Sequence, residues 1–233
     1  MKKHLLHCQA WLTALCCLAT GSLLAAELHG EPPPLDKAGR FWVYRDGTAN
    51  PRMPFSPYGW MSDAAPSDVI QLDLECHDSP HVLDATTAAN GDNTCLRLTV
   101  NWTNATWAAV SFISGPDKPA WWGNTNGGTY YDLRKLHRKK LIAYLRGDKG
   151  GERVTVKLGI LAQRPFGDSL AKPIASDLLE LSTSWQRYEL DLSAEPPEEL
   201  SHICNGFGIL LERSSQPGES TRTRIYLDNI YFE

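Results

Sequence analysis

Residues 96–102 of the chain read Leu-Arg-Leu-Thr-Val-Asn-Trp, and every second side chain in this stretch is apolar. Successive side chains of a β-strand point to opposite faces of the sheet, so this pattern predicts a strand with one buried face and one face in water. The same alternation recurs in three further segments, at 70–76, 153–158 and 188–192. Half-buried strands of this kind are typical of antiparallel sheets.

Turn-forming residues separate these segments and mark the ends of further expected strands. Apolar or alternating runs between Gly, Pro, Asn and Asp predict five more strands, at 41–45, 106–113, 140–146, 206–213 and 223–232. No stretch shows the extended 3.6-residue periodicity of a helix, so the crossover helices of an α/β fold are not expected. The sequence therefore predicts an all-β fold, a two-sheet antiparallel β-sandwich of the jelly-roll kind.

The first 26 residues have the layout of a secretory signal. A positively charged start at residues 2–4 precedes an apolar run over residues 10–24, and Ala25-Ala26 supplies small side chains for cleavage. About 15 apolar residues are too few to span a bilayer. We therefore expect a signal peptide at 1–26, a linker at 27–40 and a β-sandwich domain at 41–233. The mature protein would be secreted, periplasmic or extracellular, without membrane insertion after cleavage of the signal.

The charge of the chain narrows its range of partners. The sequence contains 23 Lys and Arg residues against 27 Asp and Glu residues. Removal of Lys2 and Lys3 with the signal leaves 21 basic side chains and a net charge of −6. A domain this acidic is poorly suited to the phosphate backbone of nucleic acid, so we expect no nucleic-acid partner.

Three cysteines remain after cleavage, at positions 76, 95 and 204. Cys76 ends one expected strand and Cys95 begins the next, and an exported protein meets an oxidising compartment. We therefore predict a disulfide between Cys76 and Cys95. It would close a loop of about 20 residues and contribute about 3 kcal/mol by restricting the unfolded chain. The alternative is a pair of unpaired, half-buried thiols.

The two ends of the expected domain resemble a known family. The opening Phe41–Gly47 (FWVYRDG), followed by Gly59-Trp60, and the close Tyr226–Tyr231 (YLDNIY) are similar to the first and last strands of jelly-roll carbohydrate-binding modules close to family eleven. Complex I intermediate-associated proteins share this pattern, within the wider group of galactose-binding-like β-sandwiches. The resemblance implies the same fold over residues 41–233 and a polysaccharide or other glycan as the ligand.

Members of that family commonly hold a structural calcium ion where the first strand meets the last. The resemblance implies that the matching ligands are the carboxylates of Asp46 and Asp228, because Ca²⁺ prefers oxygen ligands. Arg45 and Asn229 stand where the family has acidic residues, and Arg45 would compete with the ion for Asp228. The alternative is that Asp46 is only a turn residue before Gly47.

The segment at residues 120–131 (AWWGNTNGGTYY) carries two adjacent Trp and two adjacent Tyr residues in a Gly- and Asn-rich loop. Adjacent aromatic side chains do not both point inward, so at least one of each pair is expected at the surface. Flat rings stack on the C–H face of a sugar, and small polar side chains pair with its hydroxyl groups. We predict a glycan-binding platform, and the alternative is a structured loop covering a sheet edge. Its members would be Trp121, Trp122, Tyr130 and Tyr131.

Two acidic residues flank the expected strand at 153–158. Glu152 and Asp168 are predicted to line the glycan groove together with Lys157. Two carboxylates also suggest hydrolysis, which requires a pair separated by roughly 5–9.5 Å. The favoured function is a secreted, non-catalytic carbohydrate-binding module, with no catalytic residue assigned. The alternatives are a polysaccharide hydrolase or lyase on the same scaffold, and a cell-surface structural or protein-interaction domain.

Overall fold

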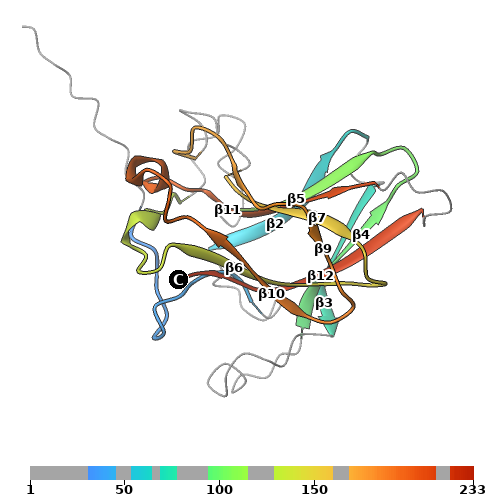
Figure 1. The fold of residues 1–233 in the computed structure, drawn as a ribbon, viewed down its shortest axis with the longest axis horizontal. Coiled ribbons are helices and arrows are strands. Elements are labelled where there is room, and N and C mark those ends of the chain that lie inside the picture. The colour runs from blue at the N-terminus through green and yellow to red at the C-terminus, as the bar shows by residue number, and fades with distance from the viewer. Residues whose placement is uncertain are drawn as a thin grey trace, which may run out of the picture.

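The computed structural model describes residues 31–45, 54–64, 69–77, 94–114, 129–159, 168–213 and 221–233. Among these residues, two six-stranded sheets form two layers, and all the paired strands run antiparallel (Figure 1). The predicted all-β, two-sheet antiparallel β-sandwich is confirmed. The expected signal peptide at 1–26 lies outside the described residues, and the described part of the chain contains no helix long and apolar enough to cross a membrane.

The first sheet is built around the last strand of the chain. Its strand order is β10-β6-β12-β4-β3, and β1 also pairs with β12. With 11 residues, β12 is long enough to pair with β4 along its first half and with β1 along its second half. The strands of this sheet are β1 (Phe41–Tyr44), β3 (Ile70–His77), β4 (Thr94–Asn101), β6 (Lys140–Gly147), β10 (Gln186–Asp191) and β12 (Arg222–Phe232).

The second sheet has the order β2-β5-β11-β7-β8, and a further short strand, β9, pairs with β7. Three of its strands were not expected from the sequence: β2, which contains Pro57 and Gly59, and the two-residue strands β8 and β9. The strands are β2 (Phe55–Ser62), β5 (Trp107–Ser114), β7 (Arg153–Leu158), β8 (Ile174–Ala175), β9 (Leu179–Glu180) and β11 (Asn205–Glu212). Two short 3₁₀ helices lie in the connections, η3 (Leu133–Lys135) and η4 (Pro197–Leu200).

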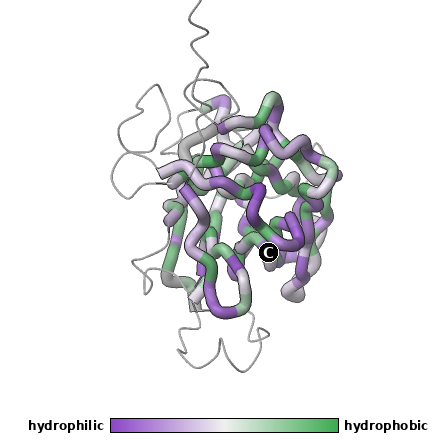
Figure 2. Tube along the Cα trace, turned by 90° about the vertical axis from the view of Figure 1, so that its left-hand side faces the viewer, coloured by the Kyte–Doolittle hydropathy of each residue, from purple (hydrophilic) through white to green (hydrophobic). Residues whose placement is uncertain are grey.

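The core lies between the two sheets and is filled by alternate residues of each strand. In β4, Leu96, Leu98 and Val100 are fully buried, while Arg97 between them is only half-buried. Figure 2 shows this alternation as hydrophobic and hydrophilic segments that follow each other along the trace. Burying each such side chain contributes about 1.5–3 kcal/mol, which is why the alternation fixes the register of the strands.

The first and last strands are held together by aromatic packing. Phe41 in β1 is the register partner of Phe232 in β12, and their ring centroids lie 5.9 Å apart. On its other side Phe41 reaches Phe55 of the second sheet, at 5.5 Å. One buried ring thus links both ends of the domain and both layers.

Cys76 in β3 and Cys95 in β4 are direct register partners. The structure has both as free thiols, with Cys95 fully buried. Burial and the neighbouring Cys76 raise the pKa of the Cys95 thiol above its usual range. The fold therefore places the two side chains opposite one another, while the bond between them stays a prediction.

Candidate functional site

Tyr131 lies in the core and not on a surface platform. It is 8% exposed, and its ring centroid lies 4.8 Å from that of Phe41 and 5.6 Å from that of Phe55. Its backbone also bridges to Glu31 and Ile203. Because its ring is surrounded by other rings, Tyr131 has no face left for a sugar, which corrects the expectation that it belongs to the platform.

Tyr130 is half-buried and points the other way. Its ring stacks on the imidazole of His202, with centroids 3.6 Å apart and planes inclined by 11°. Burial, and after it the nearby Cys204 and Asp168, raise the pKa of Tyr130 to about 12. One face of this ring is therefore already occupied. Trp121 and Trp122, the other two members of the predicted platform, lie outside the described residues.

Glu152 closes the turn between β6 and β7. Its Oε1 accepts hydrogen bonds from the backbone N–H groups of Asp148, at 3.0 Å, and Lys149, at 2.7 Å. Its Oε2 packs so closely on Gly147 that a Cβ atom at that position would collide with it. These contacts give Glu152 a structural role in the turn that connects the two sheets.

Asp168 is fully buried beyond the other end of β7. Its Oδ1 accepts hydrogen bonds from the backbone N–H groups of Cys204, at 2.6 Å, and Asn205, at 2.9 Å. Burial raises the pKa of this carboxyl to about 6, although the two backbone hydrogen bonds and the Cys204 thiol oppose the rise. The strand of six residues between Glu152 and Asp168 spans roughly 20 Å, so these carboxylates do not form the close pair that hydrolysis needs.

Asp228, one of the two predicted calcium ligands, is fully buried in a bulge of β12. Its Oδ1 accepts from the backbone N–H of Asn229, at 2.7 Å, and its Oδ2 from the Asn229 side-chain amide, at 3.2 Å. The second ligand, Asp46, lies outside the described residues. Within the described parts of the chain no three His, Cys, Asp or Glu side chains gather to hold a metal ion. Asp228 alone does not make a calcium site.

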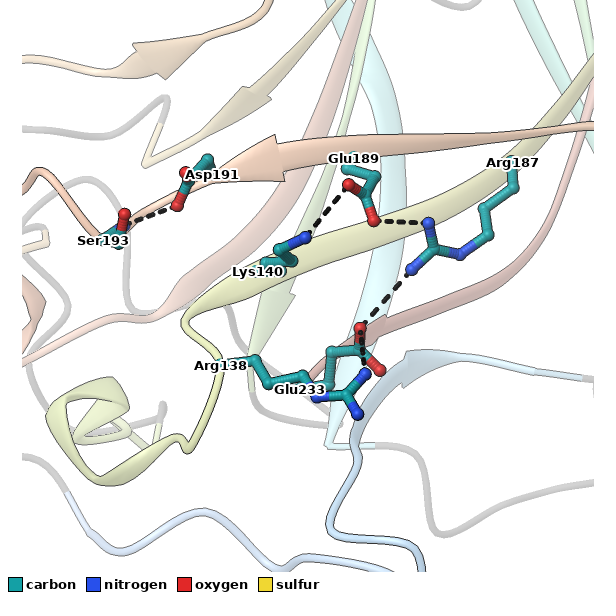
Figure 3. A network of polar contacts seen from close by, with 7 residues as sticks. All are labelled: Arg138, Lys140, Arg187, Glu189, Asp191, Ser193 and Glu233. Atoms are coloured by element: carbon teal, nitrogen blue, oxygen red, sulfur yellow. Dashed lines mark hydrogen bonds and ion pairs between the residues drawn. The ribbon is translucent and has the colours of Figure 1, made fainter.

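The outer face of the first sheet carries aromatic rings that are already covered. Trp42, Tyr231 and Ile142 form a buried cluster there, and the Arg45 guanidinium lies 5.1 Å from the Trp42 ring centroid. Figure 3 shows a network of charged side chains from β6, β10 and the C-terminal residue. Glu189 binds Lys140 and Arg187, and Glu233 binds Arg138 and Arg187. Because rings and charges on this face are mutually satisfied, little is left to bind a ligand.

The outer face of the second sheet is different, since a groove of about 560 Å³ lies over β5, β11 and β7. The strand register builds it row by row. Trp107 of β5 faces Glu212 of β11, and in the next row Ala109 lies opposite Leu210. In the third row Gly208 lies between Ser111 on one neighbouring strand and Lys157 on the other. Small side chains on the middle rows leave room for the groove, and Trp107 and Lys157 stand at its sides.

The functional groups around this groove are not engaged within the described part of the protein. The Trp107 indole N–H and the charged groups of Lys157, Glu212 and Arg213 make no hydrogen bond or ion pair with any other described residue. Trp107 itself is half-exposed, whereas most aromatic rings of this domain are buried. The groove thus offers one ring, two cations and one anion for contact with a ligand.

The backbone at the start of β5 is held in place from outside the groove. The Asp63 carboxylate accepts hydrogen bonds from the Thr106 hydroxyl and from the Thr106 backbone N–H, the latter at 2.8 Å. These hydrogen bonds lower the pKa of Asp63, the Thr106 hydroxyl contributing most. This contact fixes the strand entry from which Trp107 projects.

Sequence reasoning did not select Trp107. The signal was present, because Trp107 begins an expected strand whose same-face residues, Ala109 and Ser111, are small. A large ring followed by small residues on one face is what a ligand groove in a sheet requires. The partners across the sheet, Glu212 and Lys157, depend on strand order and register, which that pattern does not contain.

The described residues thus form a β-sandwich with a groove beside Trp107 on the outer face of its second sheet. No family model matches the chain, and no curated protein matches it in sequence. Among solved structures, the family 30 carbohydrate-binding module of a cellulosomal cellulase of Clostridium thermocellum is similar, with 16% identity over 83% of this chain and 96% of that chain, at a TM-score of 0.46.

Two further solved structures are similar at the same level. The family 11 carbohydrate-binding module from Clostridium thermocellum, in complex with a β-1,3-1,4-mixed-linked tetrasaccharide, has 7% identity over 77% of this chain and 88% of that chain, at a TM-score of 0.38. An exo-β-agarase has 10% identity over 82% of this chain and 25% of that chain, at a TM-score of 0.46. These likenesses are of overall architecture.

Proposed function

We propose that this protein is a secreted, non-catalytic carbohydrate-binding module that holds a glycan in the groove formed by Thr106, Trp107, Ala109, Lys157, Leu210, Glu212 and Arg213. One observation carries the proposal. Trp107 is partly exposed beside small and apolar side chains, and the described residues offer no partner to its indole N–H or to the neighbouring charged groups.

The chemistry of a sugar fits these groups. The flat C–H face of a pyranose ring stacks on an indole, and its hydroxyl groups both donate and accept hydrogen bonds. Lys157, Arg213 and the indole N–H supply donors, and Glu212 supplies acceptors. The volume of about 560 Å³ lies within the range of small-molecule sites. The small side chain of Ala109, which lines the groove, leaves room for a ring beside Trp107.

The non-catalytic part of the proposal is supported by the distance between the acidic residues. Glu152 serves the turn before β7 and Asp168 lies buried after it, so neither belongs to the groove and the two cannot act as a hydrolytic pair. A hydrolase or lyase would have to use other residues. A protein-interaction domain remains the alternative in which Trp107 contacts a protein surface.

Binding to soluble and insoluble polysaccharides, by affinity electrophoresis and pull-down, tests the proposal. Trp107→Ala should weaken binding at least about tenfold, since an aromatic anchor in a groove is a typical hot spot. Trp185→Ala is the matched control, because Trp185 lies beside Arg146 of the other sheet. Unchanged binding by Trp107→Ala, or an equal loss in Trp185→Ala, contradicts the groove. Release of reducing ends would instead favour an enzyme.

The aromatic pair Trp121 and Trp122 stays a separate proposal as a second stacking element. The double variant Trp121→Ala/Trp122→Ala should lower affinity without lowering the melting temperature. If the double variant binds as the unaltered protein does, the platform is removed from the proposal, while the Trp107 groove is judged by its own variant.

A structural calcium ion also stays a proposal, supported by the buried carboxylate of Asp228 at the place where β1 and β12 meet. Such an ion would join the two ends of the domain. A chelator should then lower the melting temperature, and added Ca²⁺ should restore it. An identical midpoint with and without chelator argues against a tightly bound ion.

A further inference from the structure

We infer that the ligand of this groove is an acidic polysaccharide, one whose sugar rings carry carboxylate groups. The inference rests on the proposed function and adds the class of glycan. It is drawn from the charges that the fold gathers around Glu212, where the groove meets a second hollow.

The two hollows adjoin because Glu212 lines both of them. The second has a volume of about 160 Å³ and lies between the β6–β7 turn, the end of β11 and the start of β12, two strands that belong to different sheets. Lys149 and Arg153 line it from the turn. Together the two hollows form a tract that passes, at Glu212, from the outer face of β7 and β11 to the end of the sandwich beside the β6–β7 turn, and we call it the basic tract.

The acidic groups of the basic tract are mostly engaged. Asp148 accepts a hydrogen bond from the Tyr226 hydroxyl, at 3.1 Å, and lies 3.9 Å from the Arg224 guanidinium. Glu152 uses one carboxylate oxygen for two backbone N–H groups. Glu212 is the one acid of the tract for which the described residues offer no partner.

Most cations of the basic tract, unlike most of its acids, have no partner among the described residues. Four of them make no side-chain hydrogen bond or ion pair with any residue that the structure describes; they are Lys149, Arg153, Lys157 and Arg213. The chain as a whole has a net charge of −4, so these four cations, for which the described residues offer no partner, form a local excess of positive charge. Uncompensated cations gathered in one concave region attract and retain anions.

The arrangement of these cations suits a chain of charged rings better than a single anion. Arg153 and Lys157 project from the same side of β7 with Thr155 between them, so their attachment points are roughly 13 Å apart. A polyuronate presents a carboxylate on every ring, and its rings still offer C–H faces to Trp107. Nucleic acid is disfavoured, because the remainder of the protein is acidic.

The probe for this inference is polygalacturonate, with its fully methyl-esterified form as the uncharged control on the same backbone. We expect the acid form to bind at least about tenfold more tightly at low ionic strength. Raising the salt concentration should weaken binding of the acid form and leave binding of the ester nearly unchanged, because salt screens charge–charge attraction alone.

Variants separate the charge of the tract from the charge of the whole protein. Lys157→Gln/Arg213→Gln should weaken binding of the acid form roughly tenfold, at about threefold for each exposed charge pair lost. Lys37→Gln/Lys135→Gln removes the same charge from exposed positions that do not line the tract and should leave binding unchanged. Glu212→Gln should tighten binding of the acid form, since it removes the unengaged anion. Melting temperatures of all three variants verify that each is folded.

The possible failures differ from one another. Equal affinity for the acid form and the ester, or tighter binding of a neutral glycan, overturns the inference and leaves the proposed function standing. A preference for single-stranded DNA over polygalacturonate also overturns it, since the tract would then bind phosphate groups more tightly than carboxylate groups. If no glycan of either class binds, the inference and the proposed function fall together.

Discussion

Asp168 is a carboxyl group with no exposure to solvent and with two backbone N–H groups held on one of its oxygens. Burial disfavours the charged form more than these hydrogen bonds favour it, and the pKa rises from an ordinary value of 3.8 to about 6. The folded protein therefore binds this proton more tightly than the unfolded chain does. The stability that Asp168 contributes is complete below pH 4 and is lost as the pH rises to about 6.

Replacement of Asp168 with Asn should remove this dependence, because an amide keeps the Oδ1 acceptor and does not ionise. The free energy of unfolding of the unaltered protein, relative to Asp168→Asn, should fall by up to about 3 kcal/mol between pH 4 and pH 7. Urea unfolding at a series of pH values measures this difference. A difference that stays constant over the range would show that Asp168 does not titrate there.

Glu152 is predicted to stabilise the β6–β7 turn, although it also lines the basic tract. Glu152→Ala removes the acceptor for the backbone N–H groups of Asp148 and Lys149, and should lower the free energy of unfolding by about 1–2 kcal/mol. Glu152→Gln keeps an oxygen at that place and should cost less than half as much. Urea unfolding compares the two variants.

Glu180→Ala is the control for the Glu152 variants, since Glu180 is an exposed acid whose side chain makes no hydrogen bond with the described residues. Its free energy of unfolding should stay within about 0.5 kcal/mol of the unaltered protein. If Glu152→Gln lost glycan binding while its free energy of unfolding stayed unchanged, Glu152 would have to be assigned to the binding site.

At the scale of elements, alternation was sufficient to predict most of the two sheets. Leu96, Leu98 and Val100 face the core in β4 because a strand buries every second side chain. Alternation did not reveal β2, in which Pro57 and Gly59 interrupt the pattern. A sheet accepts proline at its edge, where one side of the strand lacks a partner, and β2 occupies such an edge.

The candidate site could be predicted only in part, because it depends on packing between segments that are far apart in the chain. Two adjacent tyrosines imply that one points inward, but the sequence does not say which; packing against Phe41 and Phe55 selects Tyr131. The Trp107 groove depends on which strands become neighbours. β5, β11 and β7 are far apart in the chain, and their pairing is set by how both sheets bury their apolar faces together.

The disulfide is a prediction about one strand pair. Cys76 and Cys95 face each other across β3 and β4, so oxidation requires no change of register. Protein purified from an oxidising compartment should show one titratable thiol after denaturation, that of Cys204. Reduction should then lower the free energy of unfolding by about 3 kcal/mol. Thiol titration of the denatured, signal-cleaved protein measures the count, and three thiols rule the bridge out.

At the scale of the whole molecule, the two outer faces have different roles. The face of the first sheet is closed by its own ion pairs, whereas the face of the second sheet keeps an open groove. Under the proposed function, stability and glycan binding are therefore served by different surfaces. The ring of Phe41 lies near the Ser114 end of β5, since its neighbour Phe55 is the register partner of Ser114, whereas the groove begins at Trp107. The two ends of this eight-residue strand are roughly 23 Å apart.

This separation predicts that Phe41→Ala will uncouple stability from binding. Phe41 is fully buried between Phe232 of one sheet, Phe55 of the other and Tyr131, so its loss leaves a cavity across both layers and should cost about 3–5 kcal/mol. Leu178→Ala, at an exposed position, should cost little.

Well below its melting temperature, Phe41→Ala should still bind the glycan with unchanged affinity, because the packing around Trp107 is untouched. Denaturation followed by circular dichroism, together with affinity electrophoresis at low temperature, measures both properties. A fall in affinity while the protein is still folded would mean that the groove is coupled to the packing of Phe41 between β1 and β12.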